Sequence, residues 1–213
     1  MIRRDGALGE LLTADAGGPP RADARRNVER LVEAARAAVA EVGVEVTAHE
    51  IARRAGVGIG TFYRRLASRE ALLEAVLNEV LGEAADVGRR ALDDPDPWRS
   101  FETFAAAYTR LRAESCGIRE AVGGACGSGL DAILGELQEL IQRLVERAQA
   151  AGVMRADLAW QDVPFLLAAV ATGERTLRLR AGGEQWERNL RVVLDGLRAP
   201  ASGPVPGEPP AAD

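Results

Sequence analysis

The sequence predicts an all-α protein with about nine helices. Apolar residues recur with a period near 3.6 residues along most of the chain. Aromatic residues make up only 4% of the 213 residues, and no run of alternating β-branched residues lasts beyond a few positions. Glycine, proline and helix-capping residues separate the periodic segments, which indicates individual helices joined by short turns.

The first predicted helix spans residues 23–42 and ends at Gly43. The next begins at the sequence TAHE, which matches a capping box. In this motif the Thr47 side chain caps the helix and the Glu50 side chain reaches back to the cap. A short helix is therefore predicted over residues 48–55.

A tight turn at Gly56 separates this helix from a second short helix, predicted over residues 59–66. Ser68 then precedes an apolar periodic segment and is predicted to cap a longer helix that fades near Leu92.

A break at DDPDP precedes the C-terminal half, with Pro97 well placed in the first turn of a helix. No strand is predicted there. The predicted helices cover residues 97–112, a short and weak stretch near 117–126, and residues 130–151, 161–180 and 184–198.

Charge is distributed unevenly along the chain, whose formal net charge is −5. Residues 21–70 contain ten arginines and seven acidic residues, whereas residues 71–213 contain fifteen arginines and twenty-two acidic residues. Residues 51–69 contain five arginines and no acidic residue, and the chain has no lysine. A basic segment on an acidic body is typical of a local contact with a polyanion.

The composition and the motifs of the sequence argue against several classes of protein. No apolar run reaches the roughly 18 residues that a membrane span needs, and no signal peptide is recognisable, so we expect a cytoplasmic protein. One histidine, His49, and two distant cysteines, Cys116 and Cys126, cannot assemble a metal site. Ser128 and Cys126 have no nearby base, so neither is expected to be a nucleophile. We expect no metal, no cofactor and no enzymatic activity.

Three glycines, Gly56, Gly58 and Gly60, raise the question of a phosphate-binding loop. A dinucleotide fingerprint needs G-x-G-x-x-G after a strand, and a P-loop needs a lysine after its last glycine. Here the spacing is G-x-G-x-G, no lysine follows, and the preceding segment is a capped helix. Two short helices joined by a tight turn favour a helix-turn-helix instead.

In this arrangement Ile51 and Ala52 of the first short helix pack against Phe62 of the second. Small residues at Ala52 and Gly56 are predicted to allow a close approach of the two helices. The opposite face of the second helix would then present Tyr63, two arginines and its N-terminal residues to solvent. Such a face suits phosphates and base edges.

The segment TAHEIARRAGVGIGTFYRRLASREALLEAV resembles the DNA-binding domain of the tetracycline-repressor (TetR) family of transcriptional regulators. The resemblance is strong over residues 24–76. It is looser in AAGVMRADLAWQDV and NLRVVLDGLR further along the chain. It implies a helix-turn-helix DNA-binding domain over residues 21–70 and a helical domain for ligand binding and dimerisation over residues 71–199. Residues 1–20 and the proline-rich residues 200–213 are expected to be disordered.

The resemblance also implies a role for individual residues. The hydroxyls of Thr47 and Tyr63 would contact phosphates, and Arg69 would contact a phosphate where the family usually has lysine. Leu66 departs from the family, which more often has an aromatic residue there. The remaining implied DNA-binding residues face bases or phosphates: Ile59, Gly60, Thr61, Arg64 and Arg65.

Gly60 offers no side chain, so specificity would rest on Arg64, Arg65, Thr61 and a methyl group of Ile59. The family resemblance further implies a small-molecule effector, expected to be hydrophobic or cationic, and a homodimer formed by the last two helices. The effector pocket would be lined by Trp98, Phe101, Phe104, Tyr108, Cys116, Ile133, Leu137, Ile141, Phe165 and Ala169.

The predicted function is therefore a ligand-responsive repressor that binds a palindromic operator as a homodimer. Two alternatives remain open: a helical small-molecule-binding protein, and an adaptor whose basic face meets an acidic protein. Salt-dependent binding to a palindromic DNA would distinguish the repressor from the first alternative, and competition by nonspecific DNA would distinguish it from the second.

Overall fold

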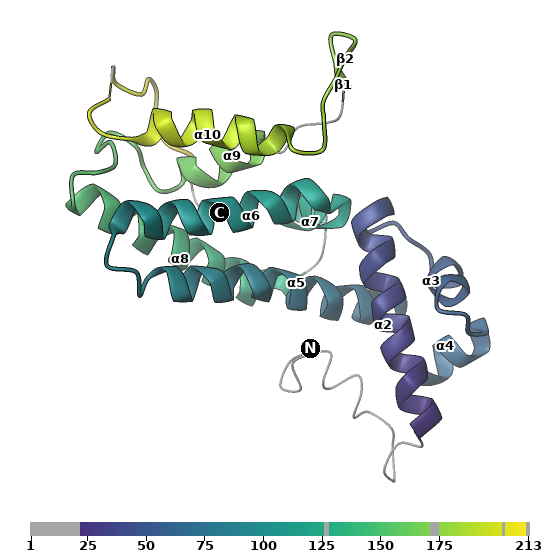
Figure 1. The fold of residues 1–213 in the computed structure, drawn as a ribbon. Coiled ribbons are helices and arrows are strands. Elements are labelled where there is room, and N and C mark those ends of the chain that lie inside the picture. The colour runs from purple at the N-terminus through teal and green to yellow at the C-terminus, as the bar shows by residue number, and fades with distance from the viewer. Residues whose placement is uncertain (1–21, 126–127, 171–174, 202, 212–213) are drawn as a thin grey trace. The chain divides into compact units, whose positions relative to one another are not determined.

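The computed structural model describes residues 22–125, 128–170, 175–201 and 203–211. Within them the fold is almost entirely helical (Figure 1), which confirms the predicted class. The helices are α2 (Ala22–Val42), α3 (Ala48–Arg54), α4 (Ile59–Arg65), α5 (Arg69–Ala91), α6 (Pro97–Glu114), α7 (Cys116–Glu120), α8 (Asp131–Ala150), α9 (Asp162–Val170) and α10 (Gln185–Leu197). A π-helical turn, η1 (Ala121–Ala125), and a 3₁₀ turn, η2 (Ser128–Leu130), lie between α7 and α8.

The chain forms two compact units. Unit 1 consists of the residues up to Gly82 together with Ser115–Leu134, and unit 2 consists of Glu83–Glu114 and the residues from Gly135 onward. Helix α5 runs without a break from one into the other. The division between DNA-binding and ligand-binding parts near residue 70 concerns function and stays a prediction.

In unit 1, the core lies between α2, α3, α4 and α7. Leu31 and Ala35 of α2 are fully buried, as are Ile51 of α3 and Phe62 of α4. The predicted N-terminal caps of α3 and α5 are confirmed. The Thr47 hydroxyl accepts a hydrogen bond from the Glu50 amide at 3.2 Å, and the Ser68 hydroxyl accepts one from the Ala71 amide.

The second half of the predicted capping box does not form. The Glu50 carboxylate accepts hydrogen bonds from Arg53 and Arg54 at 2.6–2.9 Å rather than reaching back to the cap. Two guanidiniums one turn away are stronger donors to a carboxylate than one backbone amide, since the hydrogen bonds are charge-assisted on both sides.

In unit 2, helices α6, α9 and α10 pack against one another. Asp96 caps α6 by accepting hydrogen bonds from the amides of Trp98 and Arg99. The centre of this unit includes fully buried apolar side chains from several helices, namely Phe101, Phe104, Leu144 and Leu167.

The prediction of a single helix over residues 161–180 is wrong. Helix α9 ends at Val170, and Arg175–Thr176 (β1) pairs antiparallel with Leu179–Arg180 (β2) in a short hairpin. Leu177 and Arg178 form its turn with φ of 46° and 64°. The alternation of leucine with polar residues from Thr176 to Arg180 has the period of a strand, a signal that the helical interpretation overlooked.

Part of the C-terminal tail lies against unit 2. Arg155 donates a hydrogen bond to the Gly203 carbonyl, and Asp157 accepts one from the Val205 amide at 2.8 Å. Hydrogen bonds from the Arg155 guanidinium, and after them the one from the Val205 amide, hold the pKa of Asp157 well below its usual value. Residues 1–20, the other segment predicted to be disordered, lie outside the described residues, as does Cys126.

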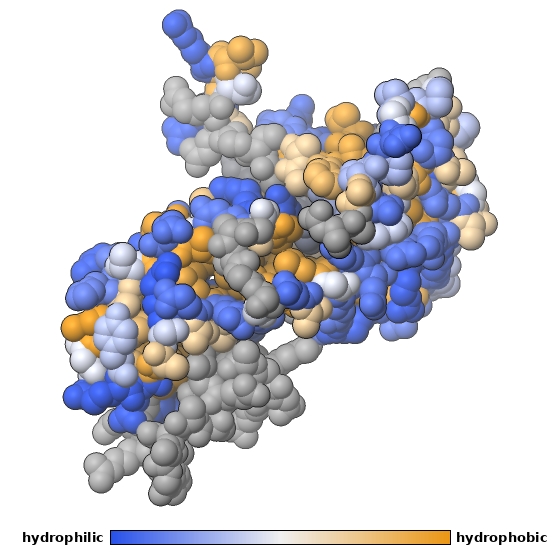
Figure 2. Space-filling view, turned by 180° about the vertical axis from the view of Figure 1, so that it is seen from behind, coloured by the Kyte–Doolittle hydropathy of each residue, from blue (hydrophilic) through white to orange (hydrophobic). Residues whose placement is uncertain are grey.

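Hydrophilic residues cover most of the face seen in Figure 2, with apolar residues gathered in patches between them. No helix in the described part of the chain combines the length and the apolar character that crossing a membrane requires.

Candidate nucleic-acid interface

Helix α4 has one buried side and one exposed side. Phe62 is fully buried, whereas the next residue, Tyr63, is 58% exposed. The two rings meet edge to face, with centroids 5.2 Å apart and planes at 73°. Phe62 therefore anchors the helix in unit 1 and helps to hold the Tyr63 ring in an outward position, where its hydroxyl can reach a ligand.

The other predicted DNA-binding residues belong, like Tyr63, to unit 1. Thr47, Gly60 and Arg64 are exposed, and the remaining four are half-buried: Ile59, Thr61, Arg65 and Arg69. They come from the N-terminus of α3, from helix α4 and from the first residue of α5. The structure thus brings all eight predicted residues into the same unit.

Arg64 is restrained by its own helix. Its Nη2 donates a hydrogen bond to the Thr61 hydroxyl at 3.0 Å, across one turn of α4. This bond uses one of the five N–H donors of the guanidinium, so four others can contact a phosphate or a base edge while its stem is oriented.

Arg53 and Arg54 contribute less positive charge than the sequence suggested. Glu50 pairs with both of them, and Glu41 pairs with Arg54 at 2.7 Å. Hydrogen bonds from Arg53 and Arg54 lower the pKa of Glu50 to about 2, so this carboxylate is ionised at neutral pH. The spacing of Glu50 to residues three and four positions later could have predicted these pairs. The basic character of the face therefore comes mainly from α4.

Arg69 supports the backbone that leads into α3. Its Nε donates to the Val46 carbonyl at 2.7 Å and its Nη2 to the Val44 carbonyl at 2.5 Å. From the other side, the Val44 amide donates to Glu120 of α7 at 2.7 Å. The Arg69 Nη1 also donates to the Glu70 carboxylate at 3.0 Å, so all three nitrogens of this guanidinium already have a partner. Two of its five N–H donors remain, and the phosphate contact of Arg69 stays a prediction.

The position of Gly56 requires glycine for its backbone conformation and not to avoid a steric clash. It has φ of +66°, and a Cβ added there would meet no atom within 4 Å. The prediction that Gly56 allows a close approach of α3 and α4 is therefore wrong. The left-handed conformation that closes the turn is what requires glycine.

The residues predicted to line an effector pocket are mostly core residues. Six of them are at most 5% exposed: Trp98, Phe101, Phe104, Tyr108, Leu137 and Ile141. Phe104 and Tyr108 stack at 5.9 Å, and burial raises the pKa of Tyr108. Cys116 and Ile133 are half-buried and belong to unit 1, so the set is divided between the two units.

Phe165 and Ala169 do not line the interior. Phe165 is 65% exposed, and Ala169 is exposed as well. Helix α9 buries Val163, Leu167 and Val170. Phe165 follows Val163 by two positions, which places it about 200° around the helix on the opposite side. The prediction that these two residues face an internal pocket is wrong for this chain.

Comparison with known protein families gives two matches. Residues 31–76 match the family described as bacterial regulatory proteins, tetR family, and residues 96–199 match the C-terminal domain described as transcriptional regulator SbtR-like. The helix-turn-helix regulator BetI 2 of Chromohalobacter salexigens is 37% identical over 73 residues. That match covers 32% of this chain and 35% of the length of BetI 2.

Among the similar solved structures are two TetR regulators that match more than four fifths of this chain. A TetR transcriptional regulator of Streptomyces coelicolor is 30% identical, with a TM-score of 0.58, and the match covers 81% of this chain and 99% of that one. A TetR regulator of Mycobacterium vanbaalenii is 32% identical, with a TM-score of 0.56 and coverage of 85% and 100%. With its helix-turn-helix and its helical C-terminal region, this chain belongs to the TetR family of bacterial transcriptional regulators.

Proposed function

We propose that this regulator is a repressor that binds a palindromic operator as a homodimer in the cytoplasm. As a member of the TetR family it is a DNA-binding regulator and not an enzyme. The observation that carries the proposal is the outward face of α4, where Tyr63 is 58% exposed on a helix anchored by the fully buried Phe62.

Each predicted DNA-binding group on this face has a role in the proposed complex. The Tyr63 and Thr47 hydroxyls donate hydrogen bonds to phosphate oxygens, which sets the position of the protein on the duplex. Arg64 and Arg65 read base edges or phosphates, and Ile59 offers an apolar contact to a thymine methyl group. Gly60 leaves room for a base pair to approach the backbone of α4.

The homodimer would form through α9 and α10. A two-fold dimer places two copies of α4 at a set separation, which matches two half-sites of a palindrome. A small hydrophobic or cationic effector in unit 2 would favour a dimer geometry in which this separation no longer fits the groove.

The most direct test selects bound sequences from a random pool of double-stranded DNA. We expect enrichment of a motif with two-fold symmetry, and binding that weakens steeply as salt increases. Failure to enrich any symmetric motif would exclude the dimeric repressor.

The two tyrosines of the chain provide a matched pair of variants for the selected operator. Tyr63→Phe removes the proposed phosphate contact, so we expect affinity to fall about fivefold to tenfold for all operator sequences alike. Tyr108→Phe removes a hydroxyl that is buried in unit 2 and should leave the affinity of the effector-free protein unchanged. Equal affinity of Tyr63→Phe and wild-type protein in a gel-shift titration would show that α4 docks differently.

A further inference from the structure

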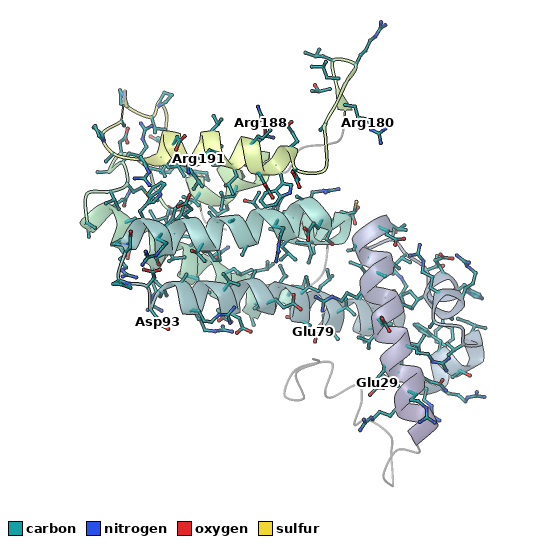
Figure 3. All side chains as sticks on the ribbon, in the orientation of Figure 1. Glu29, Glu79, Asp93, Arg180, Arg188 and Arg191 are labelled. Carbon is teal, nitrogen blue, oxygen red and sulfur yellow. The ribbon has the colours of Figure 1, made fainter. Side chains whose placement is uncertain are left out.

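Helix α6 carries a buried arginine, Arg112, near its C-terminal end. This residue is 9% exposed, and it is the one buried arginine among the described residues. A surface position is more usual, as Figure 3 shows for Arg188 and Arg191 on the outer part of α10. Moving a guanidinium out of water costs free energy unless polar or charged groups surround it. The position of Arg112 therefore indicates a binding or structural role.

Two hydroxyl groups lie next to Arg112 on the same side of α6. Tyr108 precedes it by four residues and Thr109 by three, which are the spacings of neighbours on a helix surface. Both are at most 3% exposed, and the guanidinium carbon of Arg112 lies 5.8 Å from the centre of the Tyr108 ring. Burial raises the pKa of Tyr108, whereas the charge of Arg112 and a hydrogen bond with it oppose this rise. These three residues form one buried polar group in unit 2, here called the Arg112 cluster.

The Thr109 hydroxyl has no hydrogen-bond partner among the described residues. The two buried serines do have one. Ser100 donates to the Ala91 carbonyl at 2.6 Å, and Ser115 accepts from the Ile118 amide at 3.3 Å. A buried hydroxyl without a partner costs free energy that a valine of the same shape would not cost. The threonine therefore points to a partner from outside the chain.

The donor groups of the Arg112 cluster suit an anion. A guanidinium has five N–H donors and a permanent positive charge, and each hydroxyl adds one more donor. A carboxylate can accept two parallel hydrogen bonds from one guanidinium and further ones from hydroxyls. An ammonium group would instead be repelled by Arg112, and this repulsion is strong where water is excluded. The cluster thus favours an anionic group and disfavours a cationic one.

Apolar rings precede the Arg112 cluster along the buried side of α6. Phe104 stacks on Tyr108, with ring centroids 5.9 Å apart and planes at 17°. Further toward the N-terminus, Phe101 is fully buried, and its ring centroid lies 5.8 Å from that of Trp98. Ligand sites in proteins are mostly apolar, with a few polar groups that fix the orientation of the ligand. This side of α6 therefore matches a ligand with an apolar body and an anionic end.

We infer that the effector is an apolar carboxylic acid whose carboxylate is bound by Arg112 together with the hydroxyls of Tyr108 and Thr109. The inference rests on the ligand-responsive function proposed above, and it narrows the effector class from hydrophobic or cationic to hydrophobic and anionic. The three side chains are closed off from solvent, so binding requires α6 to move relative to helices packed on it, which include α9 and α10. Because α9 and α10 also form the proposed homodimer, this movement would change the dimer geometry.

The test compares ligands that share an apolar body and differ in the end group. Benzoate and octanoate carry a carboxylate, benzyl alcohol and octanol carry a hydroxyl, and benzylamine and octylamine carry an ammonium group. Isothermal titration calorimetry measures their binding to the full-length protein without DNA. We expect at least one carboxylate to bind about 10-fold to 100-fold more tightly than its matched alcohol, and the amines to bind more weakly than the alcohols.

Substitutions of two arginines of α6 test the assignment of the charge. Arg112→Met removes the charge and keeps an unbranched side chain, so we expect the affinity for the carboxylate to fall to that for the alcohol. Arg112→Lys keeps the charge but loses the paired donors, and should retain part of the affinity. Arg110→Met is the matched control, because Arg110 is exposed on the same helix, and should bind the carboxylate as wild type does.

Thr109→Val distinguishes a role in binding from a role in the fold. Valine has nearly the shape of threonine and lacks the hydroxyl that finds no partner within the described chain. We expect the ligand-free variant to melt about 2–4 °C higher than wild type, and to bind the carboxylate about fivefold to tenfold more weakly. A hydroxyl that serves only the fold would lower the melting temperature when removed and leave the affinity unchanged.

Several results would overturn the inference. They are binding of an amine as tight as that of its matched carboxylate, unchanged carboxylate binding by Arg112→Met, and absence of carboxylate binding at millimolar concentrations. Circular dichroism checks that each variant is folded. The comparison of end groups and the Thr109→Val variant both retain Arg112, so they decide the matter even where Arg112→Met does not fold.

DNA binding separates this inference from the proposed function. If a carboxylate binds through Arg112 but the protein selects no symmetric DNA motif, the anion site is supported and the repressor proposal is excluded. If the protein selects an operator but binds neither carboxylate, the anion site is excluded and the repressor proposal is supported. If both bind, the carboxylate should release wild-type protein from the operator in a gel shift but not Arg112→Met, and a failure to release wild type would overturn the assignment as effector site.

Discussion

Gly56, Gly58 and Gly60 stand close together in the sequence but differ in backbone conformation. Gly56 has φ of +66°, whereas Gly58 caps α4 with φ of −70° and Gly60 lies within the helix. A Cβ at any of the three would meet no atom within 4 Å. Only Gly56 is therefore required by the fold, because side chains other than hydrogen disfavour its backbone conformation.

We predict that Gly56→Ala lowers the free energy of unfolding by about 1–2 kcal/mol, the cost of a left-handed conformation for a residue with a Cβ. Gly58→Ala is the matched control, since it adds the same methyl group in open space at an ordinary φ. Its cost is that of a poorer N-cap and should stay below about 1 kcal/mol, less than that of Gly56→Ala. Urea unfolding followed by circular dichroism measures both. Equal effects of the two substitutions would contradict this account of the turn.

Gly60 provides a test of base readout without a change of fold. Gly60→Ser adds a side chain to an exposed position of α4 with no neighbour within 4 Å, so we expect stability to stay the same or rise by a few tenths of a kcal/mol. The hydroxyl would instead occupy the space left for a base pair. Operator selection with this variant should return a changed preference at one position in each half-site. An unchanged motif would show that Gly60 does not face the bases.

At the scale of elements, the N-terminus of α3 combines a cap with an ion-pair cluster. Thr47 caps the helix, and Glu50 in its first turn binds Arg53 and Arg54 in the next. This arrangement stabilises a helix of only seven residues, which by itself would be too short to persist in water.

The Glu50 cluster predicts a pH dependence of stability. The folded-state pKa of Glu50 is about 2, below its ordinary value of 4.5, so its stabilising effect is complete above pH 4.5 and is lost as the pH falls toward 2. We expect Glu50→Gln to be less stable than wild type at pH 7, and the difference to disappear near pH 2. Chemical unfolding at several pH values measures this difference.

Glu33→Gln is the control for this measurement, because Glu33 is exposed on α2 and forms no ion pair within the described residues. Its substitution should leave stability nearly unchanged at both pH values. A Glu50→Gln difference that is the same at pH 2 and pH 7 would show that the ion pairs do not stabilise α3.

The elements also show where prediction from sequence succeeds. The caps at Thr47 and Ser68 and the ends of α2 and α3 depend on residues within one or two turns, and they were predicted correctly. The structure of the segment after α9 was predicted wrongly. There, apolar residues compatible with a helix continue into an alternating pattern, and neighbouring residues alone do not choose between the two.

At the scale of the whole molecule, the proposed dimer makes a prediction about operator geometry. Two copies of α4 related by a two-fold axis require half-sites about one helical turn apart, or a multiple of it. Inserting about five base pairs between the half-sites rotates one of them to the opposite side of the duplex. We therefore expect affinity to fall to that of a single half-site, measured by fluorescence anisotropy. An affinity that does not depend on spacing would indicate independent binding by monomers.

The sequence by itself determined the helical class, the positions of most helices and the place of the helix-turn-helix, because these depend on local patterns: a 3.6-residue period, helix caps and a glycine turn. Only the tertiary structure decided which arginines remain available for DNA and which side of α9 faces outward. Glu41 lies thirteen residues before Arg54, Arg69 reaches carbonyls more than twenty residues away, and the exposure of Phe165 depends on what α6 and α10 cover. Such contacts join distant parts of the chain, so they exist only after the chain has folded.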